Sequence, residues 1–401
     1  MRDIESYGYY VFQDKIFTDR QEIADYMIVN EVYDGKIYFN YNDHVFSKID
    51  WTKEVPFNLA DLYRMRAEQL RQKYKYLVLS FSGGSDSTQV LMTFLRNNIF
   101  LDEIIIVNYN DAIKKIDENK IQEVNGLKIF KEYDLAAKPI LDVFSKNSPK
   151  TKINVLDLSD FSFKQHIIRK TYDHICTDRS KFTNNVALVS IAPRTFAHYI
   201  AKYMSENATY NRAALIRGVD KPSLSVENDE LFFKFYDIAY HGVHNFGSDK
   251  IDRIYDVEDF YWSPDFPFIP VKQCQVIKNE IETNKDYHRL FFYKMAKIQN
   301  YIKNKVEGHS PAWELERTYN EIIYPYWKNS IYTAPKPTLQ SSEFTLWEHL
   351  GYKQYGKEII EEVKSHMYKK YEKIQNKTLL IQKPLGGKPY SIGKIQRRFY
   401  V

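Results

Sequence analysis

The stretch Tyr76–Val90, YLVLSFSGGSDSTQV, decides the fold prediction for this chain. It begins with an apolar run over Tyr76–Phe81 that predicts a buried strand, passes through glycines and serines, and continues in a helical pattern over Ser87–Asn97. Glycines allow a sharp turn with exposed backbone amides, and the free amides at the start of a helix attract anions. The stretch therefore predicts an anion site at a strand-to-helix junction.

Strand and helix patterns alternate over the following part of the chain. Nearly continuous apolar runs such as LVLSF and EIIIV are typical of parallel strands that are covered on both faces. The predicted strands are Tyr76–Phe81, Glu103–Asn108, Lys152–Leu158, Ala213–Arg217 and Phe232–Ile238. Helical periodicity between them is clearest over Ser87–Asn97 and Ala192–Glu206. We therefore predict an α/β fold with a Rossmann-like, doubly wound parallel sheet.

Changes in composition and hydrophobic pattern along the sequence suggest three parts. Residues 1–60 contain short alternating pieces, such as Lys36–Asn40, and are expected to form an N-terminal accessory cap. Residues 61–260 form the predicted α/β domain, entered through an amphipathic helix near residues 58–73. Prolines at 264, 267 and 270 mark the join to residues 261–401, which we expect to be mainly helical, rich in aromatic side chains and in contact with a substrate or partner.

Composition limits the classes of function. The 57 Lys and Arg against 52 Asp and Glu give a net charge of +5, so charge alone does not indicate a nucleic-acid binder. The 33 Tyr and 25 Phe favour a core or interface role, with base stacking as the alternative. Two cysteines, Cys176 and Cys274, fit a reducing compartment and exclude a zinc ribbon. With no apolar signal core or membrane-length stretch, we expect a cytoplasmic protein without a membrane partner.

One carboxylate, Asp86, lies within the predicted anion site. A carboxylate beside an anion is unfavourable unless a divalent cation bridges them, so the stretch suits a magnesium-bound polyphosphate. A simple helix cap is the alternative, but a single Ser or Asp would suffice for that. The loop lacks the Gly-Lys-Ser/Thr ending of the common nucleoside-triphosphatase loop, which makes γ-phosphate transfer the less favoured chemistry.

The sequence SGGSDS resembles the signature of the PP-loop ATP pyrophosphatase superfamily, also described as N-type ATP pyrophosphatases, PAPS reductase-like proteins or the adenine nucleotide α-hydrolase-like fold. The resemblance implies a HUP-type Rossmann-like domain that binds ATP and Mg²⁺. It also implies cleavage between the α- and β-phosphates, with AMP passed to a substrate oxygen. Carried over residue by residue, it assigns pyrophosphate binding to Ser82, Gly83, Gly84, Ser85, Asp86 and Ser87. Asp86 is the expected magnesium partner.

Residues at two further strand ends complete the predicted site. Asn108 is expected to contact the nucleoside, with an ordinary turn role as an equal alternative. Arg217 and Lys221 flank Gly218 near the same sheet edge and are expected to offset phosphate charge, unless they belong to an ordinary charged turn. We assign Asp86, Lys221 and Arg217 as candidate catalytic residues.

Three other sequence features give weaker indications of function. His241 and His244 are three residues apart, but no third ligand is close in sequence, so a substrate-facing loop is favoured over a metal site. Trp262–Asp265 is interpreted as a packed join in preference to a substrate wall. The basic KIQRR tail could contact RNA, a protein partner or neither, and the sequence does not distinguish these alternatives.

Missing features narrow the predicted chemistry. Sulfonucleotide reductases use a cysteine near the C-terminus, and the tail here has none. Thiolation enzymes commonly use paired cysteines, and none occur here. A glutaminase-type synthetase has a cysteine nucleophile at the position where this sequence has Arg2. We predict an ATP-dependent ligase that adenylates a carbonyl or carboxylate oxygen of a small-molecule or nucleobase substrate, followed by attack of an amine, ammonia or external sulfur nucleophile. The alternatives are a nucleic-acid-modifying enzyme and a catalytically silent nucleotide-binding scaffold. Nucleic acid and a homo-oligomer stay open as partners.

Overall fold

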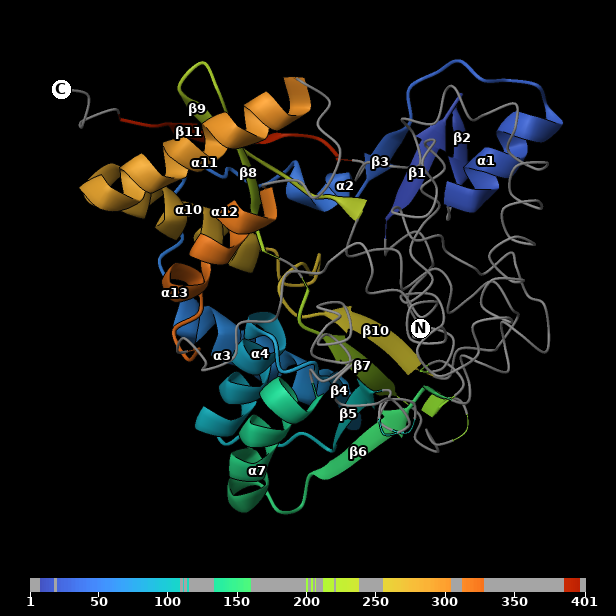
Figure 1. Ribbon diagram of the computed structural model, residues 1–401, viewed down its shortest axis with the longest axis vertical. Coiled ribbons are helices and arrows are strands. Elements are labelled where there is room, and N and C mark those ends of the chain that lie inside the picture. The colour runs from blue at the N-terminus through green and yellow to red at the C-terminus, as the bar shows by residue number, and fades with distance from the viewer. Residues whose placement is uncertain are drawn as a thin grey trace.

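The computed structural model describes residues 8–17, 20–108, 111, 114, 133–159, 200, 203–204, 206, 212–219, 221–237, 255–303, 312–327 and 386–396. These residues form a mixed α/β structure whose largest sheet lies in the lower half of the view in Figure 1. Two smaller antiparallel sheets and a group of helices lie above it.

The large sheet contains five parallel strands in the order β10-β7-β4-β5-β6. Its strands, in chain order, are β4 (Tyr76–Ser80), β5 (Glu103–Asn108), β6 (Lys152–Asp157), β7 (Ala213–Arg217) and β10 (Tyr255–Asp259). The chain starts at the central β4, adds β5 and β6 on one side, and then adds β7 and β10 on the other. This order is compatible with a Rossmann-like fold, and the strands predicted at β4, β5, β6 and β7 are confirmed.

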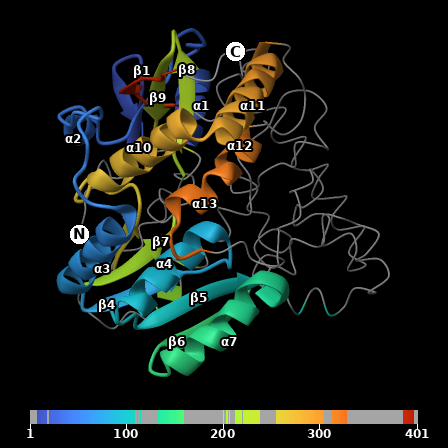
Figure 2. The same ribbon diagram turned by 90° about the vertical axis from the view of Figure 1, so that its left-hand side faces the viewer.

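Helices flank this sheet (Figure 2). They are α3 (Leu59–Lys73), α4 (Ser85–Arg96) and α7 (Lys138–Asn147), the last preceded by a π-helical turn, η3 (Tyr133–Ala137). Asn58 caps α3 by accepting a hydrogen bond from the Asp61 amide, as expected at a helix start. Apolar side chains of α3 and α4, including Leu62, Leu70 and Val90, are fully buried, which confirms both predicted helices.

The predicted fifth strand of the parallel sheet, Phe232–Ile238, is wrong. The segment begins within β9 (Glu230–Lys234), which pairs antiparallel with β8 (Ser223–Glu227) and with β11 (Tyr390–Lys394). Leu231 and Phe233 are buried and their neighbours are half-buried, the alternation of a strand with one covered face. The turn between β8 and β9 has two residues with positive φ, as a tight hairpin requires.

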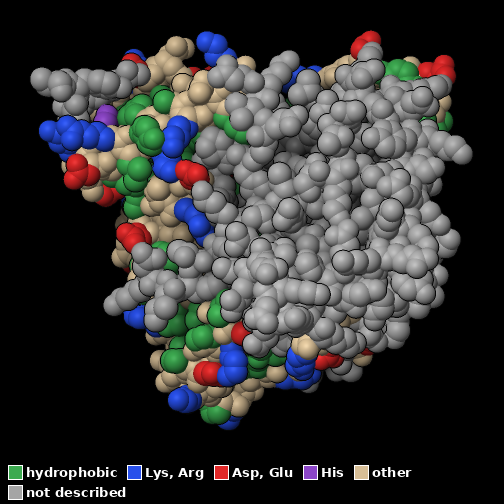
Figure 3. Space-filling model, viewed as in Figure 1, with side chains coloured by type: hydrophobic (Ala, Val, Ile, Leu, Met, Phe, Trp, Pro, Cys, Tyr) green, Lys and Arg blue, Asp and Glu red, His purple; other side chains and the backbone are tan. Residues whose placement is uncertain are grey.

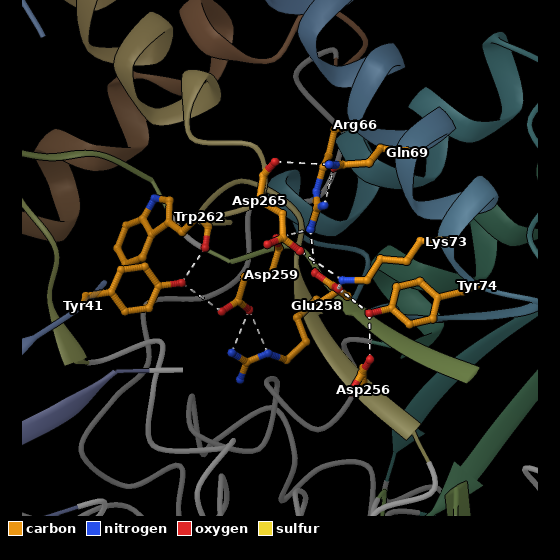
Figure 4. Close-up of polar contacts among 11 residues, drawn as sticks. Tyr41, Arg66, Gln69, Lys73, Tyr74, Asp256, Glu258, Asp259, Trp262 and Asp265 are labelled. Atoms are coloured by element: carbon orange, nitrogen blue, oxygen red, sulfur yellow. Dashed lines mark hydrogen bonds and ion pairs between the residues drawn. The ribbon is translucent and has the colours of Figure 1, made fainter. Parts of the chain in front are cut away.

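The fifth parallel strand is β10, and a buried ion network explains how a strand with the sequence YDVED can be inside. Arg66 of α3 and Glu258 of β10 are both fully buried and lie 2.7 Å apart. Lys73 contacts the same carboxylate at 3.0 Å, and Tyr74 donates a hydrogen bond to it. Figure 4 shows these side chains converging on Glu258. Cations from α3 therefore neutralise the charge that β10 buries.

The N-terminal part forms a small antiparallel sheet, β2-β1-β3, with two helices beside it. Its elements are β1 (Tyr9–Phe12), β2 (Lys15–Phe17), α1 (Arg20–Val29), β3 (Tyr38–Asn40) and α2 (Asp43–Phe46). Aromatic rings join this part to the β8–β9–β11 sheet. Phe46 lies 4.5 Å from Phe235, and Trp51 lies 4.8 Å from Tyr390, measured between ring centroids. These aromatic residues serve a core, as the composition favoured.

The C-terminal part is helical over α10 (Phe268–Thr283), α11 (Lys285–Lys303), α12 (Ala312–Thr318) and α13 (Asn320–Ile323). These helices lie within residues 261–401, the part that the sequence predicts to be mainly helical. The only described residues after 327 are 386–396, which contain the strand β11, so residues 304–311, 328–385 and 397–401 of the predicted aromatic-rich part lie outside the described residues. Most of the predicted helix at 192–206 also lies outside them. The three domain boundaries stay predictions.

Surface chemistry gives two further observations. On the face shown in Figure 3, Lys and Arg side chains are interspersed with Asp and Glu side chains over the described part of the chain. No helix among the described residues is long and apolar enough to cross a membrane.

Candidate functional site

The loop predicted to bind an anion follows β4 at the centre of the parallel sheet. It connects Ser80, the last residue of β4, to Ser85, the first residue of α4. β4 lies between β5 and β7, where the order in which the chain adds strands reverses. Ligands of open parallel sheets bind at this kind of position, beyond the carboxyl ends of the strands. Ser82–Ser87 thus follow the carboxyl end of the central strand, as the sequence predicts, and their binding of an anion stays a prediction.

Two glycines allow neighbouring segments to pack closely against the loop. Gly83 has a φ of +80°, and a Cβ there would lie 2.6 Å from the backbone nitrogen of Ala137. On the other side, a Cβ on Gly218 would lie 3.0 Å from the carbonyl carbon of Asp86. The loop is thus held between the end of η3 and the turn after β7; a Cβ at Gly83 would overlap the backbone of η3, and one at Gly218 would press against the backbone of Asp86.

Replacement of Gly83 by alanine tests this packing. We expect Gly83→Ala to lower the free energy of unfolding by about 2–5 kcal/mol, because a left-handed backbone and a forced contact in a packed site each destabilise by about 1–3 kcal/mol. Gly84→Ala is the matched control, since Gly84 has a φ of −69° and its added Cβ would contact only the Ser82 hydroxyl, at 3.2 Å. Urea denaturation of both variants measures the difference, and equal losses would contradict the packing described.

Serine side chains fix the inner surface of the loop. The Ser82 and Ser87 hydroxyl oxygens are 3.2 Å apart, and Ser82 accepts a hydrogen bond from the Gly84 amide at 3.2 Å. Ser87 also donates to the Gly84 carbonyl at 3.3 Å. The first amides of α4 have no partner within the helix and carry the positive end of its dipole. The hydroxyls of Ser82 and Ser87 thus lie beside the positive end of α4, where an anion would be stabilised.

Asp86 is the charged centre of the site. The ammonium of Lys221 lies 2.7 Å from its Oδ1 and 2.8 Å from its Oδ2. Tyr324, just after α13, donates its hydroxyl to Oδ1, and Tyr261, just after β10, donates to the Asp86 backbone carbonyl at 2.8 Å. The Asp86 side chain keeps 26% of its surface exposed, so it is accessible to a small ligand.

The tyrosines beside Asp86 are held in their neutral form. Burial raises the pKa of Tyr324 well above its ordinary value, and the negative charge of Asp86 raises it further. Burial likewise raises the pKa of Tyr261, with smaller contributions from Tyr63 and Asp86. Both phenols are therefore protonated at neutral pH and act as hydrogen-bond donors.

The two predicted cations are placed differently. Lys221 reaches the loop, as the prediction of a shared sheet edge requires. Arg217, at the end of β7, pairs with Asp259 at the end of β10, with Nε and Nη2 at 3.0 and 2.7 Å from Oδ1. Arg217 lies at the correct sheet edge, beside Ser80 of β4 in the strand register, but engages a carboxylate that the sequence prediction did not include.

Asn108 ends β5 and is almost fully buried, with its carbonyl accepting the Leu158 amide at 2.9 Å.

Several other residues that the sequence analysis singled out lie outside the described residues: Asp220, His241, His244, Cys176 and the residues at 109 and 110. Cys274 is buried in α10, and burial raises the pKa of its thiol well above the ordinary value, which fits a packing role. Trp262 is buried, with its ring 5.1 Å from that of Phe235, as a packed join requires.

The site's donor set fits magnesium carried by a nucleotide better than a resident metal. Among the residues that the structure describes, no group of three or more His, Cys, Asp or Glu side chains is arranged to hold a metal ion. Mg²⁺ in nucleotide sites is often bound by one or two carboxylates together with substrate phosphates and waters. Asp86, whose side chain is part-exposed, is a carboxylate of the kind that such a site uses.

Comparison with known proteins gives no assignment: no protein-family model matches the chain, and no curated protein matches it significantly. Function is therefore inferred from the geometry of the site and from the resemblance of its loop.

Proposed function

We propose that this protein is an ATP pyrophosphatase of the PP-loop type, an ATP-dependent ligase that adenylates a carbonyl or carboxylate oxygen of its substrate. The observation that carries the proposal is the contact between Lys221 and Asp86 at the loop after β4. It brings a second strand end to the SGGSDS loop at the position where parallel sheets bind ligands. On this proposal the domain is a doubly wound, HUP-type Rossmann-like fold in a cytoplasmic enzyme.

The loop residues hold the leaving group. Amides at the start of α4 and the hydroxyls of Ser82, Ser85 and Ser87 donate to the β- and γ-phosphates, together with the amides of Gly83 and Gly84. Asp86 would hold Mg²⁺, which supplies positive charge that stabilises the departing pyrophosphate. These groups act on the side of ATP that leaves, so the protein itself needs no nucleophile.

Lys221 has a second role in this scheme. In the nucleotide-free structure it neutralises Asp86. Two cations on one carboxylate repel each other, so Lys221 would move from Asp86 toward the phosphates if Asp86 held Mg²⁺. There it stabilises the negative charge that develops during cleavage. Arg217 and Asn108, at the ends of the strands on either side of β4, are proposed to contact the α-phosphate and the nucleoside.

The adenylated oxygen becomes a good leaving group, and an amine, ammonia or an external sulfur donor then displaces AMP. The substrate is a small molecule or a nucleobase. We assign its recognition to surfaces beyond the loop.

The test uses ATP labelled in the α-phosphate, Mg²⁺, and fractions of a cell extract as a source of substrate. We expect one fraction to provoke release of labelled AMP and an equal amount of pyrophosphate, with no turnover when Mg²⁺ is chelated. Fractions treated with ribonuclease separate a nucleic-acid substrate from a small molecule. Release of labelled ADP with inorganic phosphate, or no turnover with any fraction, would overturn the proposal.

A further inference from the structure

Residues 323–327, in the C-terminal part of the chain, form hydrogen bonds with α3, with α4 and with Asp86 at the start of α4. The Tyr63 hydroxyl of α3 donates to the Ile323 carbonyl at 2.7 Å. The Tyr326 amide donates to Oε1 of Gln89 on α4 at 2.9 Å, and the Arg96 guanidinium of α4 lies 5.1 Å from the Tyr326 ring centroid. Residues 323–327 are thus attached to both helices that flank the central strand.

Tyr324 lies in the middle of this segment and is almost fully buried, with 1% of its surface exposed. Its hydroxyl donates to Oδ1 of Asp86. Its ring lies 5.5 Å from the ring of Tyr261 and 5.8 Å from the Lys221 ammonium. The phenol is therefore fixed in position by its surroundings, as a group that orients another side chain must be.

The two donors on Asp86 differ in their response to a metal ion. Lys221 contacts both carboxylate oxygens and carries a positive charge, so it competes with a cation. Tyr324 contacts Oδ1 and is neutral, so its hydrogen bond is compatible with a cation bound at Oδ2. When Lys221 moves to the phosphates, Tyr324 is the group that keeps the carboxylate oriented.

We propose that Tyr324 is a positioning residue that orients Asp86 for magnesium-bound ATP, which links the C-terminal part of the chain to the nucleotide site. This inference rests on the proposed function. Hydrogen bonds to a ligating carboxylate set its orientation, and their loss typically weakens metal binding by about 10- to 100-fold. Through the same bond, occupation of the loop is coupled to the C-terminal part of the chain.

The variant Tyr324→Phe, which removes one hydroxyl and keeps the ring, tests the proposal. Isothermal titration calorimetry measures the affinity for ATP in the presence of Mg²⁺ and again in EDTA. We expect the affinity with Mg²⁺ to fall by about 10-fold and the affinity in EDTA to stay unchanged. Tyr326→Phe, the same chemical change two residues away at a side chain whose ring contacts Arg96, should match the wild type in both conditions.

Each outcome has a distinct meaning. Equal affinity of Tyr324→Phe and wild type with Mg²⁺, or an equal loss with and without Mg²⁺, would overturn the positioning role and leave the proposed function intact. A wild-type protein that binds no ATP would overturn both. Hydrogen exchange of residues 319–327 in the wild type is independent of how the variant folds. The proposal expects stronger protection with Mg²⁺ and ATP than with ATP in EDTA, and equal protection would contradict it.

Discussion

Replacing Asp86 by asparagine is expected to reduce magnesium-dependent pyrophosphate release by roughly 100- to 1,000-fold. A bound metal ion stabilises the transition state by several kcal/mol, and each factor of ten in rate corresponds to about 1.4 kcal/mol. Asparagine has the same shape and can still accept the Tyr324 hydrogen bond, but it lacks the charge that holds Mg²⁺. The overall fold should persist, which circular dichroism checks alongside the rate.

Asp142→Asn on α7 is the matched control for Asp86→Asn. Asp142 also pairs with a single lysine, Lys138 at 2.6 Å, but it lies on an exposed helix surface. The same carboxylate-to-amide change there should leave pyrophosphate release unchanged. Full activity of Asp86→Asn would remove Asp86 from the mechanism, and equal losses in both variants would show that the effect is not specific to the loop.

The second large effect concerns stability. We expect Arg66→Met to lower the free energy of unfolding by about 3–5 kcal/mol, the usual result of removing one member of a buried ion pair. Lys73 stays beside Glu258 at 3.0 Å, but it is part-exposed and does not replace the hydrogen bonds of the buried guanidinium. Arg66 holds the Glu258 carboxylate at 2.7 Å and the Asp259 carbonyl at 3.2 Å, and neither Arg66 nor the Glu258 side chain is exposed to water. Denaturant unfolding followed by circular dichroism measures the change.

Two further variants show whether the loss of stability in Arg66→Met comes from the buried ion pair. Arg64→Met, two residues away on α3, removes an exposed arginine paired with Glu68 at 2.8 Å and should change stability little, because solvent screens such pairs. The double variant Arg66→Met and Glu258→Gln removes both charges and should recover part of the lost stability. If Arg66→Met were as stable as Arg64→Met, the buried pair would not be what allows β10 to enter the sheet.

Three of the four confirmed strands, β4, β5 and β7, could be predicted from their own apolar sequences, whereas β6 is only half-buried. β4, β5 and β7 are apolar runs that bury both faces, and a doubly covered strand needs no information from elsewhere in the chain. β10 carries Asp256, Glu258 and Asp259 in five residues. It is stable inside because Arg66 and Lys73, more than 180 residues earlier in the sequence, neutralise Glu258. A local pattern cannot contain that partner.

The candidate site likewise contains residues that the local sequence indicates and residues that it does not. The loop Ser82–Ser87 and the approach of Lys221 follow from the end of one strand and its neighbour in the sheet. Tyr261 and Tyr324 reach Asp86 from 175 and 238 residues away, and the sequence indicates them only through its excess of tyrosine. Arg217 pairs with Asp259 because β10 is the neighbour of β7 in the sheet, and the sequence around Arg217 does not indicate that neighbour.

The most direct test of the account is a crystal structure with Mg²⁺ and the α,β-methylene analogue of ATP, which cannot be cleaved at the proposed bond. We predict β- and γ-phosphates against the amides and hydroxyls of Ser82–Ser87, the ion on Asp86, and Lys221 moved from Asp86 to a phosphate oxygen. An analogue bound elsewhere, or reversed so that its nucleoside fills the loop after β4, would contradict the account.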